Sequence, residues 1–99
     1  MNEQLLEALR EVIDPELGIN VVDLGLIYNA ELEKGHARVA MTLTTPACPL
    51  APEVQAAAEA AIWRRVAGVE SVDVRLVWSP PWRPAMMSDD AKDEMGWMD

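Results

Sequence analysis

Two runs of alternating apolar and polar residues, joined by a glycine-containing turn, constrain the fold of this chain more than any other feature. The alternation from Leu26 to Glu33 resumes from His36 to Leu43, and Lys34-Gly35 lies between the two runs. Alternation with a period of two is typical of a half-buried strand, and a short glycine turn closes a hairpin. The pattern predicts an antiparallel hairpin whose inner residues are Leu26, Tyr28, Ala30, Leu32, Ala37, Val39, Met41 and Leu43.

A helix and a third strand follow the hairpin. Apolar residues recur at helical spacing from Leu50 to Val66, Gly68 ends this run, and a strand-like run extends from Val69 to Trp78. A strand, a helix of about four turns and another strand form a crossover unit, which is right-handed if the two strands are parallel in one sheet. The sheet is therefore three-stranded and mixed, with Val72, Val74, Leu76 and Trp78 also facing inward, and its strand order stays open.

The first helix is predicted from the apolar stripe of Leu5, Leu6, Leu9, Val12 and Ile13. Asn2 caps this helix, and Pro15 disfavours helical geometry at Asp14, so the helix should end near Ile13. The fold class is then a two-layer α/β (α+β) arrangement, with two main helices on one face of the sheet and a short C-terminal helix.

The segment after the last strand is rich in proline, methionine and tryptophan. Three prolines between Ser79 and Pro84 exclude a central strand, and Ser88 is suited to cap a short helix that begins with Asp89 and Asp90. We expect one domain over residues 1–99, with 79–99 as a C-terminal covering segment. A docking surface is the second interpretation, and the large apolar side chains concerned are Trp82, Met86, Met87, Met95 and Trp97.

Composition narrows the class of partner. The chain has 99 residues and a formal net charge of -9, which disfavours binding to phosphate backbones and anionic lipid surfaces. A single cysteine cannot form an internal disulfide, and neither a signal peptide nor a membrane-spanning stretch is expected. A cytoplasmic protein that binds neither nucleic acid nor membrane fits these features.

That cysteine, Cys48, is the best functional clue. It lies between a strand-like run and a helix-like run, where unpaired peptide N–H groups favour thiolate over thiol. Pro49 suits the first helical position, which would make Cys48 the cap, and an alternative start at Pro52 moves the cap by one turn. Thr44 and Thr45 add hydroxyls near the thiol. The competing interpretation is that Cys48 is only a small buried apolar side chain.

Two carboxylates, Asp14 and Glu16, form a second polar cluster near the end of the first helix, where acids do not favour the helix dipole. Turn chemistry at Asp-Pro is the commoner explanation, and the same holds for Asp23. His36 is predicted to be an exposed turn residue. One cysteine and one histidine cannot complete a structural zinc site, so any soft metal held by Cys48 must be shared with another molecule or another copy of the chain.

Four segments taken together resemble the MIP18 family, also called the domain of unknown function 59 (DUF59) family. Their order and spacing carry the resemblance, which extends from the first helix almost to the last residue. The residues from Met86 to Ser88 and from Met95 to Trp97 are similar to those of bacterial single-domain metal-sulfur cluster assembly factors. The four segments are Asp14–Gly18, Val22–Tyr28, Thr42–Pro49 and Val77–Trp82.

This resemblance implies an accessory factor in iron-sulfur cluster assembly or delivery to apoproteins, related to the SufT proteins and to the PaaD proteins of phenylacetate degradation. The chain lacks the added cysteine-bearing segment of many PaaD-type members, which favours the SufT-like reading. The implied pocket comprises Asp14, Glu16, Leu17, Thr44, Thr45 and Cys48. Cys48 would ligate iron or a cluster edge transiently, with no stably bound cofactor and no catalytic residue.

Two other classes stay open. Cys48 is the nucleophile if the chain is a thiol-dependent redox or acyl-transfer enzyme, although no base is evident. Alternatively, the chain is a protein-interaction adaptor without metal. The implied partners are the iron-sulfur assembly machinery and recipient apoproteins, and self-association is left open.

Overall fold

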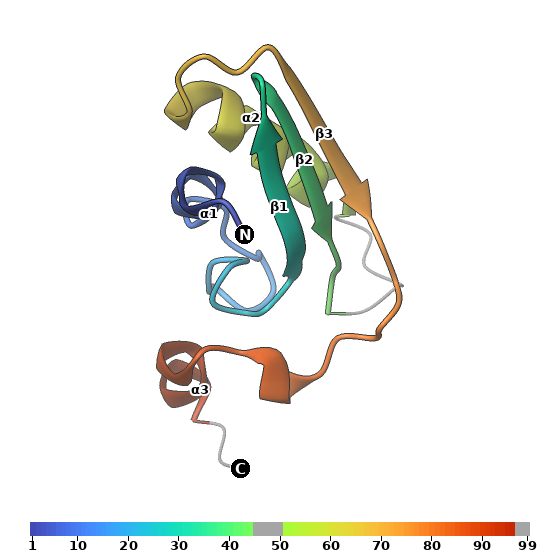
Figure 1. Cartoon of the computed structure of the whole chain (residues 1–99). Coiled ribbons are helices and arrows are strands. Elements are labelled where there is room, and N and C mark those ends of the chain that lie inside the picture. Colours follow the sequence, from blue (N-terminus) through green and yellow to red (C-terminus); the bar gives the residue numbers. More distant parts are fainter. Residues whose placement is uncertain (45–50, 97–99) are drawn as a thin grey trace.

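The structure is a computed structural model that describes residues 1–44 and 51–96. Three strands form one mixed sheet in the order β1-β2-β3. Strand β1 (Ile27–Glu33) pairs antiparallel with β2 (His36–Met41), and β2 pairs in parallel with β3 (Ser71–Leu76). The predicted hairpin and crossover are therefore confirmed (Figure 1).

Two connections produce this topology, the hairpin turn between β1 and β2 and the helical crossover from β2 to β3. Lys34 and Gly35 have φ values of 50° and 81°, the left-handed conformation that a tight hairpin turn of this type requires. Helix α2 (Ala51–Arg65) then carries the chain back along the sheet so that β3 starts beside His36. Cys48, Pro49 and Leu50 lie outside the described residues, so the predicted cap of α2 is not described.

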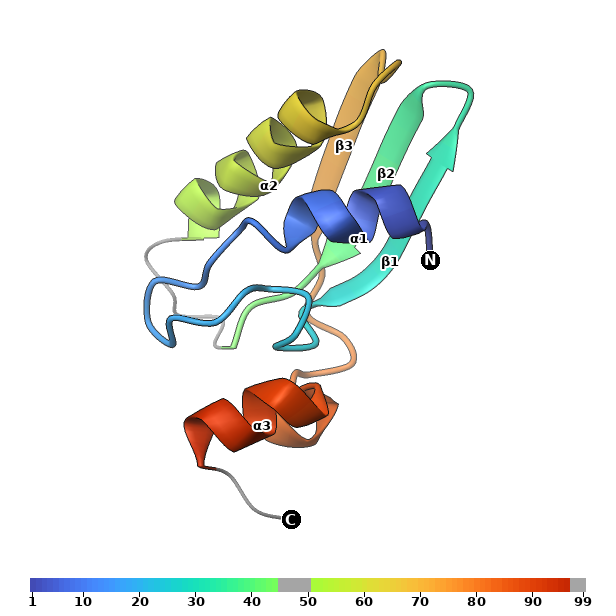
Figure 2. The same ribbon diagram turned by 90° about the vertical axis from the view of Figure 1, so that its left-hand side faces the viewer.

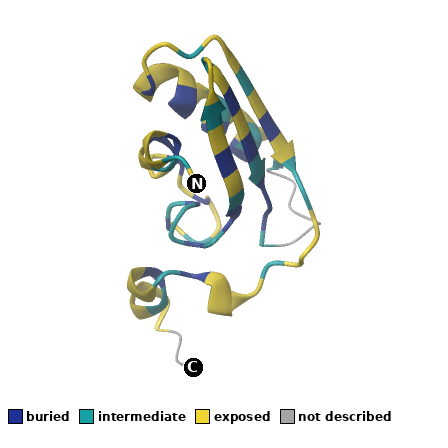
Figure 3. Cartoon of the chain, viewed as in Figure 1, coloured by how far each residue is buried: buried dark blue, intermediate teal, exposed yellow. Residues whose placement is uncertain are grey.

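Helices α1 (Glu3–Leu9) and α2 lie on the same face of the sheet (Figure 2). The side chain of Asn2 caps α1 by accepting a hydrogen bond from the backbone N–H of Leu5, at 3.0 Å, as predicted. Between the helices and the sheet lies one apolar core, which accounts for the banding of buried and exposed positions along the strands (Figure 3). Its fully buried large members include Leu5, Leu9, Leu24, Leu26, Met41 and Ile62.

Three details differ from the sequence expectations. Helix α1 ends at Leu9 rather than near Ile13, which is 51% exposed and forms a bridge with Asn20 instead. A β-bulge between Ile27 and Asn29 inserts one residue into β1, so Ile27 is buried and Tyr28 is only half-buried. Trp78 was predicted to face inward but is 43% exposed, because β3 ends at Leu76.

The segment after β3 folds back against the turn from Val21 to Gly25. It contains the 3-10 helix η1 (Pro84–Met86) and helix α3 (Asp89–Met95), which Ser88 caps as predicted. The indole N–H of Trp82 donates to the Leu24 carbonyl oxygen at 2.6 Å, and the Ser88 N–H donates to that of Asp23 at 2.7 Å. Met87 and Ala91 are buried against the core, whereas Met86 and Met95 are exposed. Trp97 lies outside the described residues.

Candidate functional site

Asp14 organises the loop that follows α1. Its side chain is buried, with the residue 3% exposed, and Oδ1 accepts hydrogen bonds from the backbone N–H groups of Glu16 at 2.8 Å and Leu17 at 3.1 Å. The Asp14 backbone N–H donates to the Ile19 carbonyl at 3.0 Å, and the Gly18 N–H donates to that of Asp14 at 2.8 Å. This is the turn chemistry expected of an aspartate before proline, and it sets the position of Leu17.

Leu17 and Thr44 come together although they lie far apart in the sequence. Leu17 belongs to the loop after α1, and Thr44 follows β2. Both are half-buried and line one cavity of about 310 Å³. Two residues of the implied pocket therefore share a cavity. Glu16 is exposed beside Leu17, and Thr45 and Cys48 lie outside the described residues.

The remaining walls of this cavity come from the C-terminal segment, which the pocket predicted from the sequence did not include. Methionine side chains and an indole make these walls mainly apolar. The only signal in the sequence was the concentration of methionine and tryptophan after residue 79. The lining residues of this part are Trp82, Pro84, Met87, Met95 and Gly96.

Asp23 serves the scaffold rather than the cavity. Its carboxylate accepts hydrogen bonds from Arg10 at 3.1 Å and from the Asn20 side chain at 2.8 Å, and its backbone carbonyl holds Ser88. His36 is exposed, as predicted, and its Nδ1 lies 2.6 Å from the Ser71 hydroxyl at the far end of β2. Neither residue lines the cavity that contains Leu17 and Thr44.

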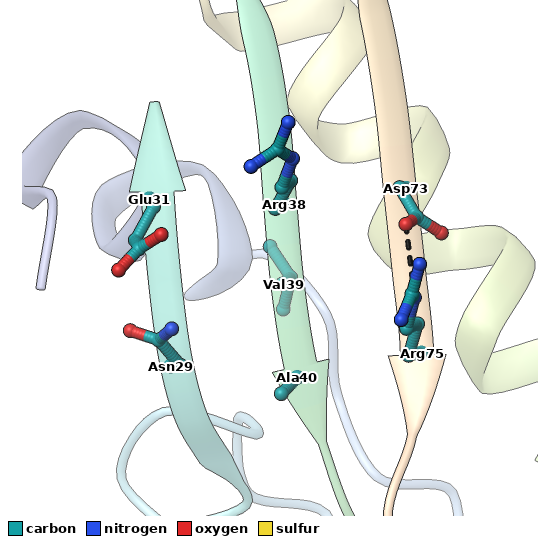
Figure 4. Close-up of a pocket in the computed structure, with 7 residues that line it drawn as sticks. All are labelled: Asn29, Glu31, Arg38, Val39, Ala40, Asp73 and Arg75. Atoms are coloured by element: carbon teal, nitrogen blue, oxygen red, sulfur yellow. Dashed lines mark hydrogen bonds and ion pairs between the residues drawn. The ribbon is translucent and has the colours of Figure 1, made fainter. Parts of the chain in front are cut away.

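A second hollow lies on the outer face of the sheet, opposite the helices (Figure 4). Its volume is about 350 Å³, and Ala40 lies between the longer side chains of the two outer strands. Glu31, Arg38 and Asp73 occupy one row across the three strands, and Asp73 pairs with Arg75 at 3.0 Å. This is a solvated charged face, and Asp14, Glu16, Leu17 and Thr44, the predicted site residues that the structure describes, do not line it.

Within residues 1–44 and 51–96, no group of three or more histidine, cysteine, aspartate or glutamate side chains is placed to hold a metal ion. Over the same residues, no helix has the length and apolar character needed to cross a bilayer. What the described geometry offers is an apolar cavity between the loop of Leu17, the end of the chain segment after β2 and the C-terminal segment, and Thr44 is the last described residue before residues 45–50.

Comparison with known proteins places this arrangement in a family. The family model described as "Iron-sulfur cluster assembly protein" matches residues 2–74. The chain is 39% identical to the Fe-S protein maturation auxiliary factor YitW of Bacillus subtilis, over 97% of this chain and 94% of the relative. It is 41% identical to the Fe-S protein maturation auxiliary factor SufT of Staphylococcus aureus, over 86% of this chain and 97% of the relative.

The fold is similar to a solved structure as well. The crystal structure of a DUF59 protein from Bacillus anthracis superposes with a TM-score of 0.89 at 38% identity, covering 93% of this chain and 88% of that one. The resemblance stated from the sequence is thus confirmed, and the chain belongs to the iron-sulfur cluster assembly protein (DUF59) family.

Proposed function

We propose that this protein is an auxiliary factor in the maturation of iron-sulfur proteins, acting in cluster assembly or in cluster delivery to apoproteins. Relatives that match nearly its whole length carry the name of Fe-S protein maturation auxiliary factors. In this proposal the protein works in the cytoplasm with the assembly machinery and recipient apoproteins, and iron or a cluster is its cargo.

The observation that best supports this proposal is the meeting of Leu17 and Thr44 in one cavity. The rest of the loop after α1, the turn at Val21–Gly25 and the whole hairpin lie between these two residues in the sequence, yet both line the same cavity. Thr44 leads directly into the segment that contains Thr45 and Cys48, and α2 continues from Ala51. A functional pocket built on this loop is consistent with that arrangement.

Cys48 is proposed as the ligand that holds the cargo. A cysteine thiolate is a soft ligand that suits iron and iron-sulfur clusters, and ligation releases the thiol proton. Because Cys48 supplies one thiolate only, cysteines of a partner protein must supply the other ligands of a cluster. The cluster can then be released by ligand exchange, without being oxidised or reduced. This arrangement suits a carrier step, in which cargo must be held and then released.

The two carboxylates have different proposed roles. Asp14 is a positioning residue, because its buried oxygen holds the backbone of Leu17 at the cavity wall. Glu16 is exposed at the same loop, where its carboxylate is suited to orient a partner or to approach iron.

A non-enzymatic role is favoured over thiol catalysis. His36 begins β2 and Thr44 lies beyond the other end of this six-residue strand, which by itself spans roughly 17 Å. Its ring is engaged with Ser71 rather than with the cavity. A general base must lie within hydrogen-bond reach of the group it deprotonates, and the single histidine does not line this cavity.

The test is replacement of Cys48 in cells that lack the native gene. We expect Cys48→Ser to leave the activities of iron-sulfur enzymes as low as in the deletion strain. Ser71→Ala, a change at the far end of the sheet, is the matched control and should restore them. If Cys48→Ser is folded by circular dichroism and restores these activities as fully as the native chain, the ligand role of Cys48 is wrong.

A further inference from the structure

The cavity beside Thr44 has the character of a docking groove for one large apolar side chain. Leu17, Trp82, Met87 and Met95 supply hydrocarbon and thioether surface, and Met95 is 43% exposed at the end of α3. The indole N–H of Trp82 already donates to the Leu24 carbonyl, so this side chain has no donor left for a ligand. A volume of about 310 Å³ is within the range of sites that hold small ligands or anchor side chains.

Acidic residues are concentrated on the two segments that supply Met95 and Leu17 to this groove. Helix α3, which ends at the groove with Met95, carries Asp89, Asp90, Asp93 and Glu94, all exposed. On the other segment Glu16 is exposed next to Leu17. The basic side chains of the same region are Arg83, which is exposed, and Lys92, which is half-buried. Negative charge therefore outweighs positive charge on the segments that line this apolar groove.

We infer that this groove binds a segment of the recipient apoprotein in which one large apolar side chain is flanked by lysine or arginine. The inference rests on the proposed function, because it names the partner surface that a maturation factor would recognise. Buried apolar anchors supply most of the affinity at protein interfaces, and complementary charge around them supplies orientation and a faster association rate. The net charge of -9 extends the attraction for a basic partner beyond the groove itself.

Charge also argues against the other occupants. A second copy of the chain carries the same net charge of -9, so seating it here would bring like charges together. The residues that follow Gly96 are Trp97, Met98 and Asp99, which would add another acid to an acidic rim. Both occupants remain outcomes that the experiment distinguishes.

The experiment measures binding of fluorescent synthetic peptides to the full chain by anisotropy, at low and at physiological salt. The probes carry a central Leu, Met or Phe between two Lys triplets. Matched peptides replace the central residue by Ser, or every Lys by Glu. We expect each replacement to weaken binding by about tenfold or more, since each removes one of the two recognised features.

Variants of the chain locate the binding. Met95→Ser removes an exposed apolar side chain, and the pair Asp93→Asn with Glu94→Gln removes two charges from the rim. We expect each to weaken the Lys-flanked peptides by about tenfold. Glu31→Gln with Glu33→Gln removes the same charge from β1 and should leave the affinity unchanged. Equal binding to Met95→Ser, to the rim variant, or to the Ser-centred peptide would overturn the inference.

Two further measurements separate this inference from its alternatives. A chain ending at Gly96 that binds the peptides while the full chain does not would assign the groove to residues 97–99. A dimer in light scattering that dissociates on Met95→Ser would assign it to a second copy. Cys48→Ser should abolish maturation and leave peptide affinity unchanged. Full maturation by Cys48→Ser would contradict the proposed function, whereas unchanged peptide affinity of Met95→Ser would contradict only the docking groove.

Discussion

Asp14 shows how a single buried acid prepares the candidate site. Its Oδ1 accepts hydrogen bonds from the backbone N–H groups of Glu16 and Leu17, and this holds Leu17 at the cavity wall. The sequence offered a functional and a structural interpretation of this residue. The contacts support the structural one, and the effect on the pocket is indirect.

Replacement of Asp14 by alanine should therefore lower stability. The backbone N–H groups of Glu16 and Leu17 lose the acceptor of two partly buried hydrogen bonds, and each such loss costs roughly 1 kcal/mol. Asp14→Asn keeps a side-chain carbonyl oxygen and should cost less than Asp14→Ala. Urea unfolding followed by circular dichroism measures both values. An unchanged midpoint for Asp14→Ala would show that water replaces the lost oxygen.

At the scale of elements, the two helices that cover the sheet are joined by an ion-pair cluster at one end. Glu11, just after α1, accepts hydrogen bonds from Arg64, at 2.8 Å, and from Arg65 in the last turn of α2. The hydrogen bond from Arg64 is the main cause that lowers the pKa of the Glu11 carboxyl below its ordinary value of 4.5. The charged form of Glu11 is therefore the one that the folded state favours.

The sign of this shift predicts a pH dependence. Because the pKa of Glu11 is lower in the folded state than in the unfolded state, its contribution to stability is present above pH 4.5 and disappears as the pH falls through the folded-state pKa. We expect Glu11→Gln to be less stable than the native chain at pH 7 and equally stable in acid. Urea titrations from pH 7 to pH 2 measure the difference. High salt should shrink it, and a difference that persists at pH 2 would contradict the role of the charge.

The elements also show where sequence patterns hold and where they fail. Caps at Asn2 and Ser88 were predicted correctly, because a cap depends only on a side chain and the N–H groups of the next turn. The end of α1 and the sheet face of Ile27 were predicted wrongly, because each depends on contacts with residues distant in the sequence. Val12 is hydrogen-bonded to Val21 instead of continuing the helix, and the bulge in β1 appears only in the pairing with β2.

At the scale of the whole molecule, the C-terminal segment is bound closely to the body of the fold. Tyr28 donates a hydrogen bond to the Pro80 carbonyl at 2.7 Å, in addition to the bonds made by Trp82 and Ser88. We propose that residues 1–99 form a single domain, in which 79–99 cover one end of the sheet and complete the cavity.

Gly25 tests this attachment. It has a φ of +78°, and a Cβ at this position would lie 2.3 Å from the Met86 carbonyl oxygen. Gly25→Ala should therefore cost more than the roughly 1–2 kcal/mol of a left-handed alanine, because the C-terminal segment must also move. Gly18→Ala is the matched control, since its φ is +71° and nothing lies within 4 Å of its Cβ. Urea unfolding compares the two, and equal losses would mean that the contact with Met86 is loose.

The sequence alone determined the order and type of the elements, the hairpin, the parallel crossover and the family, because each is encoded in local periodicity, turn chemistry and the order of short motifs. The tertiary structure alone decided that Leu17 and Thr44 line one cavity with Trp82, Met87 and Met95. No local pattern carries that information, since these residues meet only when the core has brought three separate segments to the same end of the sheet.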